Sequence, residues 1–147
     1  MSAEPAREFV DTNVLVYAYD GGAGAKAEQA RELVAGLWRS SQGCLSLQVL
    51  QELFVTITRK VPKPMPVAGA AALIEDLSQW TLHEPVRTDV LAAIELHRQK
   101  RISLWDALIV QSALQLRCRT IWSEDLNAGQ AFGAIRVRNP FAETRRG

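Results

Sequence analysis

Short apolar runs alternate with longer amphipathic stretches along most of this chain, and this alternation limits its fold more than any other feature. Five strand-like runs are expected, most of them separated by helix-like segments, at residues 8–10, 43–47, 81–82, 120–122 and 135–138. Strands that are separated by helices pair in parallel, and the helices cover both faces of the sheet. The sequence therefore predicts an α/β fold, a three-layer sandwich around a central parallel sheet.

The segments between these runs have the apolar spacing of helices. Helices are expected at residues 14–18, 26–38, 48–59, 67–79, 86–100 and 103–116. The first of these is rich in β-branched residues, so a strand is an open alternative there. Residues 61–66 contain three prolines and cannot form a regular helix.

Length and composition exclude several classes of protein. A chain of 147 residues with 48% hydrophobic and 22% charged residues fits one globular domain, expected over residues 1–147. No apolar run approaches the roughly 20 residues of a membrane span, and no signal peptide is evident. Cys44 and Cys118 match no metal-ligand spacing. We expect a cytoplasmic protein, whose net charge of +1 permits a nucleic-acid substrate without requiring one.

Two acidic residues follow predicted strands. Asp11 comes directly after the first strand, and Asp125 closely follows the strand at residues 120–122. Ligands of open parallel sheets bind beyond the carboxyl ends of strands, so both acids occupy a favoured position. Each also has an ordinary explanation, because aspartate is a common helix N-cap and a common turn residue.

Two further acids interrupt apolar helices. Glu52 lies in a predicted helix that is apolar around most of its circumference, where a carboxylate needs a metal ion or an arginine. An exposed edge of the helix is the competing explanation. Asp106 shares a helix face with Val110 and Ala113, although Ser103 and Asp106 also have the spacing of a capping box.

The four acids carry more meaning together than singly. If they converge, each adjacent pair of carboxylates repels by up to about 4 kcal/mol at an effective dielectric constant of 20. Such a cluster persists by protonation or by binding a hard divalent cation, and Mg²⁺ and Mn²⁺ prefer oxygen ligands. A metal ion bound there can activate a water molecule and offset the charge of a phosphate.

The acidic motifs resemble those of the PIN-domain family, and most closely those of VapC-type toxins of bacterial toxin–antitoxin pairs. The resemblance covers nearly the whole chain and rests on residues 9–20 (FVDTNVLVYAYD), Glu52, residues 102–109 (ISLWDALI) and residues 121–126 (IWSEDL), with residues 129–133 and 139–141 resembling one subgroup.

The resemblance implies a parallel sheet of order 3-2-1-4-5 and an acidic pocket for Mg²⁺ or Mn²⁺. It implies metal-dependent endonuclease activity on single-stranded or looped RNA. The matching positions are the acids Asp11, Glu52, Asp106 and Asp125, their neighbours Thr12, Asn13 and Ser123, and also Asp20. Because residues 123–125 place two acids side by side, either Glu124 or Asp125 can face the metal.

The chemistry of the residues agrees with this activity. Asp11 and Asp106 are expected to be the main metal ligands, with Glu52 and Asp125 completing the pocket around waters or a second ion. Water would then attack phosphorus and leave a 3′-hydroxyl and a 5′-phosphate. The resemblance further implies a homodimer and a small antitoxin protein whose C-terminal segment fills the acidic pocket.

Other functions stay open at this point. A Mg²⁺-dependent aspartyl phosphotransferase or phosphatase needs a second acid at position 13, where this chain has Asn13, and a lysine near the site. An inactive PIN-like RNA-binding module would not need clustered acids. A metal-free acid–base pair of His83 and His97 is a weaker alternative, since both are expected on the surface. The four tryptophans are expected in the core or in dimer contacts rather than stacked on bases.

Overall fold

The computed structural model describes residues 6–22 and 24–142. Among these residues the helices are α1 (Thr12–Tyr19), α2 (Ala25–Ser40), α3 (Leu47–Arg59), α4 (Val67–Leu77), α5 (Arg87–Lys100) and α6 (Leu104–Gln115). The strands are β1 (Glu8–Val10), β2 (Gly43–Ser46), β3 (Thr81–His83), β4 (Thr120–Trp122), β5 (Ala131–Phe132) and β6 (Ile135–Arg138). No helix in the described part of the chain is long and apolar enough to cross a membrane.

The strands form one sheet of order β3-β2-β1-β4-β6-β5, and every pairing is parallel except that of β5 with β6. The predicted α/β fold is therefore confirmed. The strand order differs from the expected 3-2-1-4-5 by one added edge strand, β5, which turns back onto β6 through Gly133 at a φ of 59°. A strand of two residues is too short to show a hydrophobic period, so the sequence pattern did not reveal it.

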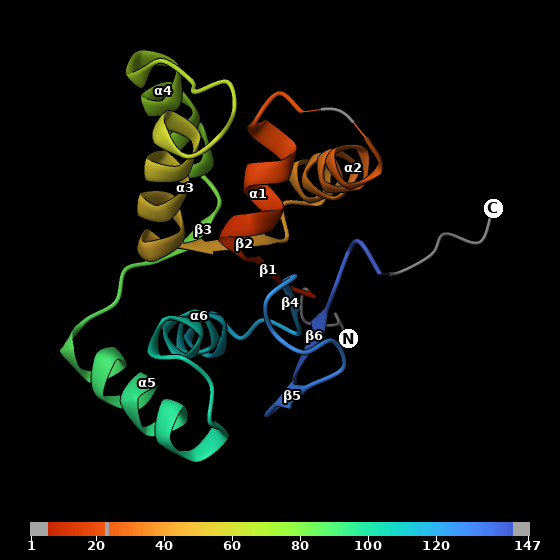
Figure 1. Cartoon of the computed structure of the whole chain (residues 1–147). Coiled ribbons are helices and arrows are strands. Elements are labelled where there is room, and N and C mark those ends of the chain that lie inside the picture. Colours follow the sequence, from red (N-terminus) through yellow and green to blue (C-terminus); the bar gives the residue numbers. More distant parts are fainter. Residues whose placement is uncertain (1–5, 23, 143–147) are drawn as a thin grey trace.

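The helices lie on both sides of the sheet (Figure 1). Helices α1 to α4 lie on one side, whereas α5 and α6 pack together on the other. The central strands are buried on both faces, and Phe9, Leu45 and Ile121 are fully inaccessible to solvent. Apolar residues around the sheet thus form the core that the three-layer prediction required.

Polar side chains cap the first turns of several helices. Asp11, Ser46 and Ser103 are the N-caps of α1, α3 and α6, and each accepts a hydrogen bond from a backbone N–H of the first turn. Residues 12–19 are helical, so the strand alternative there is wrong. The proline-containing segment is irregular as expected, and it returns toward α3 where Met65 N donates to the Ile57 carbonyl at 2.8 Å.

The middle of the sheet is where the chain reverses its direction of winding. Strand β1 pairs with β2 on one side and with β4 on the other. The segments leaving β1 and β4 consequently separate, one toward α1 and the other toward the β4–β5 loop. Parallel sheets open a crevice at such a switch point, and Asp11 and Ser123 lie at its edge.

Candidate active site

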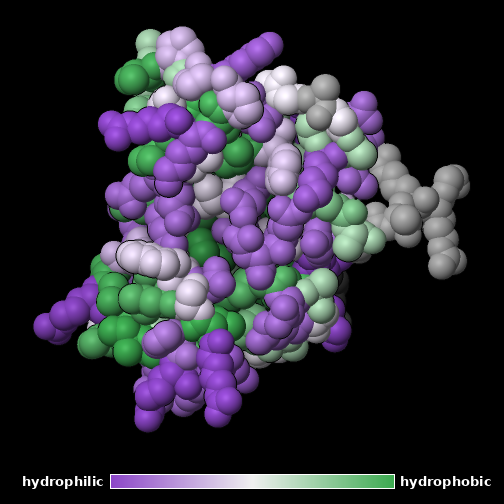
Figure 2. Space-filling model, in the orientation of Figure 1, coloured by the Kyte–Doolittle hydropathy of each residue, from purple (hydrophilic) through white to green (hydrophobic). Residues whose placement is uncertain are grey.

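A cavity of about 440 Å³ lies between α1, α3, α6 and the segment after β4. All four predicted acids line it, together with the predicted neighbours Thr12 and Asn13. The surface is hollowed on this side between the half that contains α3 and the half that contains α6 (Figure 2). Residues from four separate parts of the sequence thus meet around one space.

Asp11 is the most deeply placed of the four acids, with 6% of its surface exposed. Its Oδ1 accepts from Thr12 N at 2.7 Å, and its Oδ2 accepts from the Ser123 hydroxyl at 2.8 Å. Burial raises the pKa of Asp11 to about 6 although both hydrogen bonds act to lower it. The negative charges of Asp125 and Asp106 add to the increase, so these three carboxylates interact electrostatically.

Glu52 and Asp106 face the cavity from opposite helices. Glu52 on α3 is half-buried, and its Oε1 accepts from the Thr12 hydroxyl at 2.9 Å. Asp106 lies in the first turn of α6, where its backbone N–H donates to Ser103 Oγ at 3.0 Å. One half of the expected capping box is therefore formed, while the Asp106 carboxylate lines the cavity.

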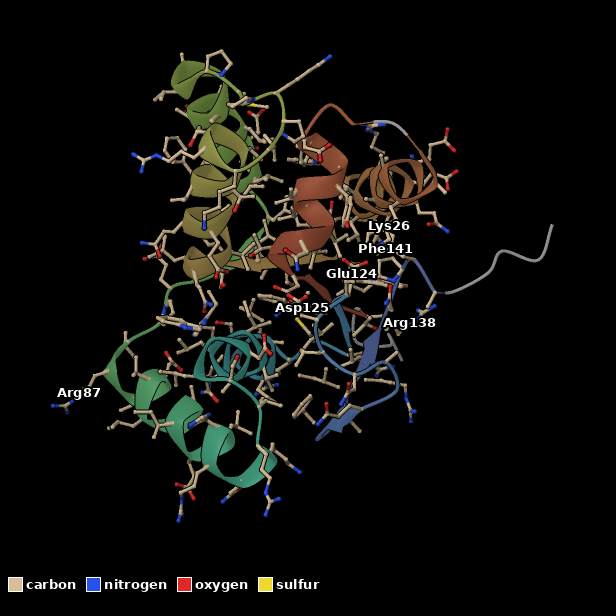
Figure 3. All side chains as sticks on the ribbon, in the orientation of Figure 1. Lys26, Arg87, Glu124, Asp125, Arg138 and Phe141 are labelled. Carbon is tan, nitrogen blue, oxygen red and sulfur yellow. The ribbon has the colours of Figure 1, made fainter. Side chains whose placement is uncertain are left out.

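The adjacent acids Glu124 and Asp125 point to different neighbours. Asp125 lines the cavity, and its Oδ2 accepts from Asn13 Nδ2 at 2.7 Å. Burial and the charge of Asp106 raise the pKa of Asp125. Glu124 instead forms an ion pair with Lys26 of α2, and Figure 3 shows it nearer to Lys26 than Asp125 is. Of the two acids that the sequence left open, Asp125 is the one on the cavity.

Most of the chain matches one known protein family. A family model described as the PIN domain matches residues 9–131. The chain belongs to the PIN-domain family. The matched range contains all four acids, so the resemblance recognised in the sequence is confirmed at the level of the family.

Two solved structures have a fold similar to that of this chain. A toxin–antitoxin complex from Klebsiella pneumoniae superposes with a TM-score of 0.68 at 16% identity, covering 90% of this chain and 97% of that one. The VapC20 toxin of Mycobacterium tuberculosis, described as cleaving the sarcin–ricin loop, gives a TM-score of 0.61 at 23% identity, with coverage of 80% and 91%. At these identities the likeness concerns the fold. A comparison with curated proteins found no match.

The cavity of this PIN domain also contains residues that sequence analysis did not single out. They are Gln48, Gln51, Val55 and Thr56 of α3, its C-cap Lys60, and Trp105 and Ile109 of α6. A signal for most of them was present in the sequence. The α3 residues and Lys60 lie one, three, four or eight positions from Glu52 and mostly share its helix face, and Trp105 directly precedes Asp106.

Asp20 and the two histidines lie elsewhere in the PIN domain. Asp20 is at the far end of α1, where its Oδ1 accepts from Gly22 N at 2.7 Å. His97 is exposed as expected and contacts the Ile102 carbonyl. The surface expectation for His83 is wrong, because its side chain is only 12% exposed and contacts Ser112 and Asp89. The two histidines therefore have separate partners and neither lines the acidic cavity.

The oxygen atoms that line the cavity are of the chemical type that a hard cation prefers. The four acids offer carboxylate oxygens, which Mg²⁺ and Mn²⁺ prefer, and the interacting charges of Asp11, Asp106 and Asp125 would be offset by such an ion. As these side chains stand, no group of three or more His, Cys, Asp or Glu within residues 6–22 and 24–142 is arranged to hold a metal ion. The metal is therefore a proposal that rests on donor chemistry and charge.

Proposed function

We propose that this PIN domain is a divalent-metal-dependent endoribonuclease and the toxin of a toxin–antitoxin pair. The observation that carries the proposal is the convergence of Asp11, Glu52, Asp106 and Asp125 on one cavity at the switch point of the sheet. Additional support comes from the fold shared with a toxin–antitoxin complex and with a toxin described as cleaving the sarcin–ricin loop.

The carboxylates have distinct roles in this proposal. Asp11 and Asp106 are the main ligands of Mg²⁺ or Mn²⁺, and Glu52 and Asp125 complete the acidic wall. When bound, the ion supplies positive charge against the phosphate and makes a nearby water more acidic. The carboxylates accept a proton as that water attacks phosphorus. The bond from phosphorus to the 3′-oxygen breaks, and this oxygen takes a proton from solvent water, leaving a 3′-hydroxyl and a 5′-phosphate.

Polar neighbours keep these acids in position. Ser123 holds one oxygen of Asp11, and the Thr12 hydroxyl holds Glu52. The Asn13 amide holds Asp125 in the same way. Hydrogen bonds that orient ligating side chains normally contribute tenfold to a hundredfold in metal affinity or activity, so these three residues are proposed as positioning residues.

An antitoxin protein is the proposed partner. The cavity concentrates acidic side chains, which suits a basic segment of a partner protein, and a similarly folded chain has been solved in a toxin–antitoxin complex. The homodimer and the cytoplasmic location stay predictions from the sequence.

The proposal is tested by incubating purified protein with a panel of structured RNAs in Mg²⁺, Mn²⁺ or a chelator. Asp106→Asn is the inactivating variant, and Glu124→Gln is the matched control because Glu124 pairs with Lys26 outside the cavity. We expect discrete fragments with 5′-phosphate ends that require metal, vanish with Asp106→Asn and persist with Glu124→Gln. Metal-independent cleavage that leaves cyclic phosphate ends would overturn the mechanism.

The same protein samples separate the two alternative functions. Covalent labelling of Asp11 by acetyl phosphate would favour the phosphotransferase, which needs a lysine near the site and finds Lys60 on the cavity wall. Retained RNA affinity after replacement of all four acids, without cleavage by the parent protein, would favour an inactive RNA-binding module.

A further inference from the structure

Trp105 differs from the other tryptophans of the described chain in what surrounds it. Trp80 and Trp122 are buried, and Trp38 packs edge-on against Trp80 with ring centroids 5.4 Å apart. Trp105 is 64% exposed. The expectation of core packing is therefore confirmed for Trp80 and Trp122, whereas for the exposed Trp38 and Trp105 the alternative of dimer contacts stays a prediction.

The position of Trp105 on the acidic cavity distinguishes it from an ordinary exposed residue. Isolated exposed apolar residues are common on protein surfaces. This one, however, lines the acidic cavity directly beside Asp106, and its carbonyl accepts from Gln48 Nε2 at 3.4 Å. Hydrophobic side chains also gather over α5 and α6 on this face of the molecule (Figure 2). The aromatic ring is thus available to a ligand that enters the cavity.

The wall opposite Trp105 is mostly polar, with Glu52 and Lys60 as its charged side chains and Val55 as its apolar one. It is a stripe along α3 in which Gln48, Gln51 and Thr56 line the cavity, with Lys60 at its far end. A glutamine amide carries both donors and an acceptor, as the edges of nucleobases do. The cavity therefore combines an aromatic face on α6 with hydrogen-bonding groups on α3.

Charge decides which part of an RNA these groups can hold. Four carboxylates line the cavity, and Lys60 is its single cationic side chain among the described lining residues. Phosphates are repelled by such a surface unless metal is present, so much of the binding energy must come from uncharged parts of the nucleotide. Bases stack on aromatic side chains whatever the charge of the site, and unpaired RNA bases are commonly recognised in this way.

We infer that Trp105 is the stacking platform for an unpaired base of the RNA substrate, with Gln48 and Gln51 facing the base edge and Lys60 facing a neighbouring phosphate. The inference rests on the proposed ribonuclease function and adds to it a site that selects unpaired nucleotides. Stacking acts in the bound substrate as well as in the transition state, so it lowers KM more than it raises kcat.

The first test uses tryptophan fluorescence in the presence of a chelator, so that no turnover occurs. Wild-type protein is titrated with short single-stranded RNA of uridine or of adenosine, beside Trp105→Phe and Trp38→Phe. We expect RNA to quench wild type and Trp38→Phe alike, and most of the quench to disappear in Trp105→Phe. Trp38 is the matched control because it is also partly exposed but lies outside the acidic cavity.

The second test is kinetic and uses the RNA that wild type cleaves. Trp105→Ala should raise KM by about 10- to 100-fold while kcat changes little, and Trp105→Phe should restore part of the loss. Circular dichroism checks that each variant is folded, which is expected because the residue is exposed.

The outcomes test the stacking role of Trp105 separately from the proposed ribonuclease activity. Unchanged KM in Trp105→Ala, with no quench of wild type, overturns the platform and leaves the ribonuclease intact. Fluorescence that responds to protein concentration but not to RNA assigns Trp105 to an interface between copies, and this too overturns the inference. A Trp105-dependent quench in a protein that cleaves no RNA supports the platform while the proposed activity fails.

Discussion

Two buried aspartates, Asp11 and Asp89, occupy opposite electrostatic environments. They are similarly inaccessible, with 6% and 7% of their surfaces exposed. Asp89 accepts from Val86 N at 2.9 Å and from Gln111 Nε2 at 3.2 Å, and His83 Nε2 lies 3.3 Å from it. These partners, the backbone N–H of Val86 first, lower the pKa of Asp89, whereas burial raises that of Asp11 to about 6.

The difference separates a structural acid from a candidate catalytic one. The donors around Asp89 stabilise its negative charge. Asp89 therefore connects the start of α5 to α6 without needing a proton or a bound cation. Burial first, and then the charges of Asp125 and Asp106, make the charge of Asp11 less favourable, so Asp11 is stabilised by a proton or by a cation that binds the cavity. Surface exposure alone therefore does not distinguish the two residues: hydrogen-bond donors outweigh burial at Asp89, whereas burial outweighs the donors at Asp11.

The largest expected effect is on RNA cleavage. Asp11→Asn should lower the single-turnover rate by about 10²- to 10⁴-fold, because it removes a carboxylate from the cavity. Asp89→Asn should leave the rate per folded molecule unchanged, because Asp89 does not line the cavity. The measurement is cleavage under single-turnover conditions, corrected for the folded fraction. An equal loss of cleavage rate in both variants would contradict the proposed distinction between Asp11 and Asp89.

The same pair of variants should change the stability of the metal-free protein in opposite directions. At pH 7, Asp11→Asn should raise the free energy of unfolding by up to about 3 kcal/mol, since a charge disfavoured by burial is removed. Asp89→Asn should lower it by about 1–3 kcal/mol, because buried donors lose a charged acceptor. Urea unfolding in chelator measures both, and a stability gain in Asp89→Asn would contradict the comparison.

The pH dependence of the Asp11 effect has a defined sign. Its pKa is about 6 in the folded protein against an ordinary value of 3.8, so the folded state binds the extra proton between these values. This contribution to stability is full below pH 3.8 and is lost as pH rises through 6. The gain from Asp11→Asn should therefore increase from pH 4 to pH 7, and a gain that is constant over this range would be the contrary result.

A divalent cation should raise the thermal stability of proteins that keep Asp11 more than that of Asp11→Asn. Mn²⁺ at 100 times its dissociation constant should stabilise the parent by about 2.7 kcal/mol and raise its Tm. Asp89→Asn should respond in the same way as the parent, whereas Asp11→Asn should respond weakly or not at all. Scanning calorimetry with and without Mn²⁺ gives the comparison. An equal rise in all three proteins would place the ion outside the acidic cavity.

The smallest expected effect is that of replacing Ser123, whose hydroxyl donates a hydrogen bond to Asp11. Ser123→Ala removes a hydrogen bond that lowers the pKa of Asp11, so the acidic limb of the pH–rate profile should move to higher pH. Cleavage should fall about tenfold, as for other residues that orient ligands. Ser112→Ala is the matched control, since this buried serine contacts His83, which in turn contacts Asp89. A shifted profile in the control would show that the effect is not local to Asp11.

Much of the fold followed from local patterns in the sequence. The alternation of strand-like and helix-like segments predicted the α/β sandwich, because side-chain periodicity is a local property of each segment. It failed for β5, where two residues are too few to show a period, whereas the helix expected at residues 14–18 is confirmed and its strand alternative is wrong. Asp11 caps the first turn of that helix at the end of β1.

The candidate site was only partly predictable from the sequence. Asp11 and Asp125 stood out by their positions after strands and Glu52 and Asp106 by interrupting apolar helices, but each of the four also had an ordinary explanation. Which explanation applied depended on how α3 and α6 pack across the switch point of the sheet, and that packing brings both carboxylates to one cavity. The family resemblance supplied this long-range information in advance.

The sequence by itself determined the order of the strands and helices and the approximate positions of the acids, because these depend on neighbours along the chain. Only the tertiary structure decided that Asp125 lines the cavity while Glu124 turns to Lys26, and that Trp105 is exposed beside Asp106. These outcomes depend on partners that are distant in sequence. The charge and solvent access of a side chain are set by everything packed around it, and no local pattern encodes that.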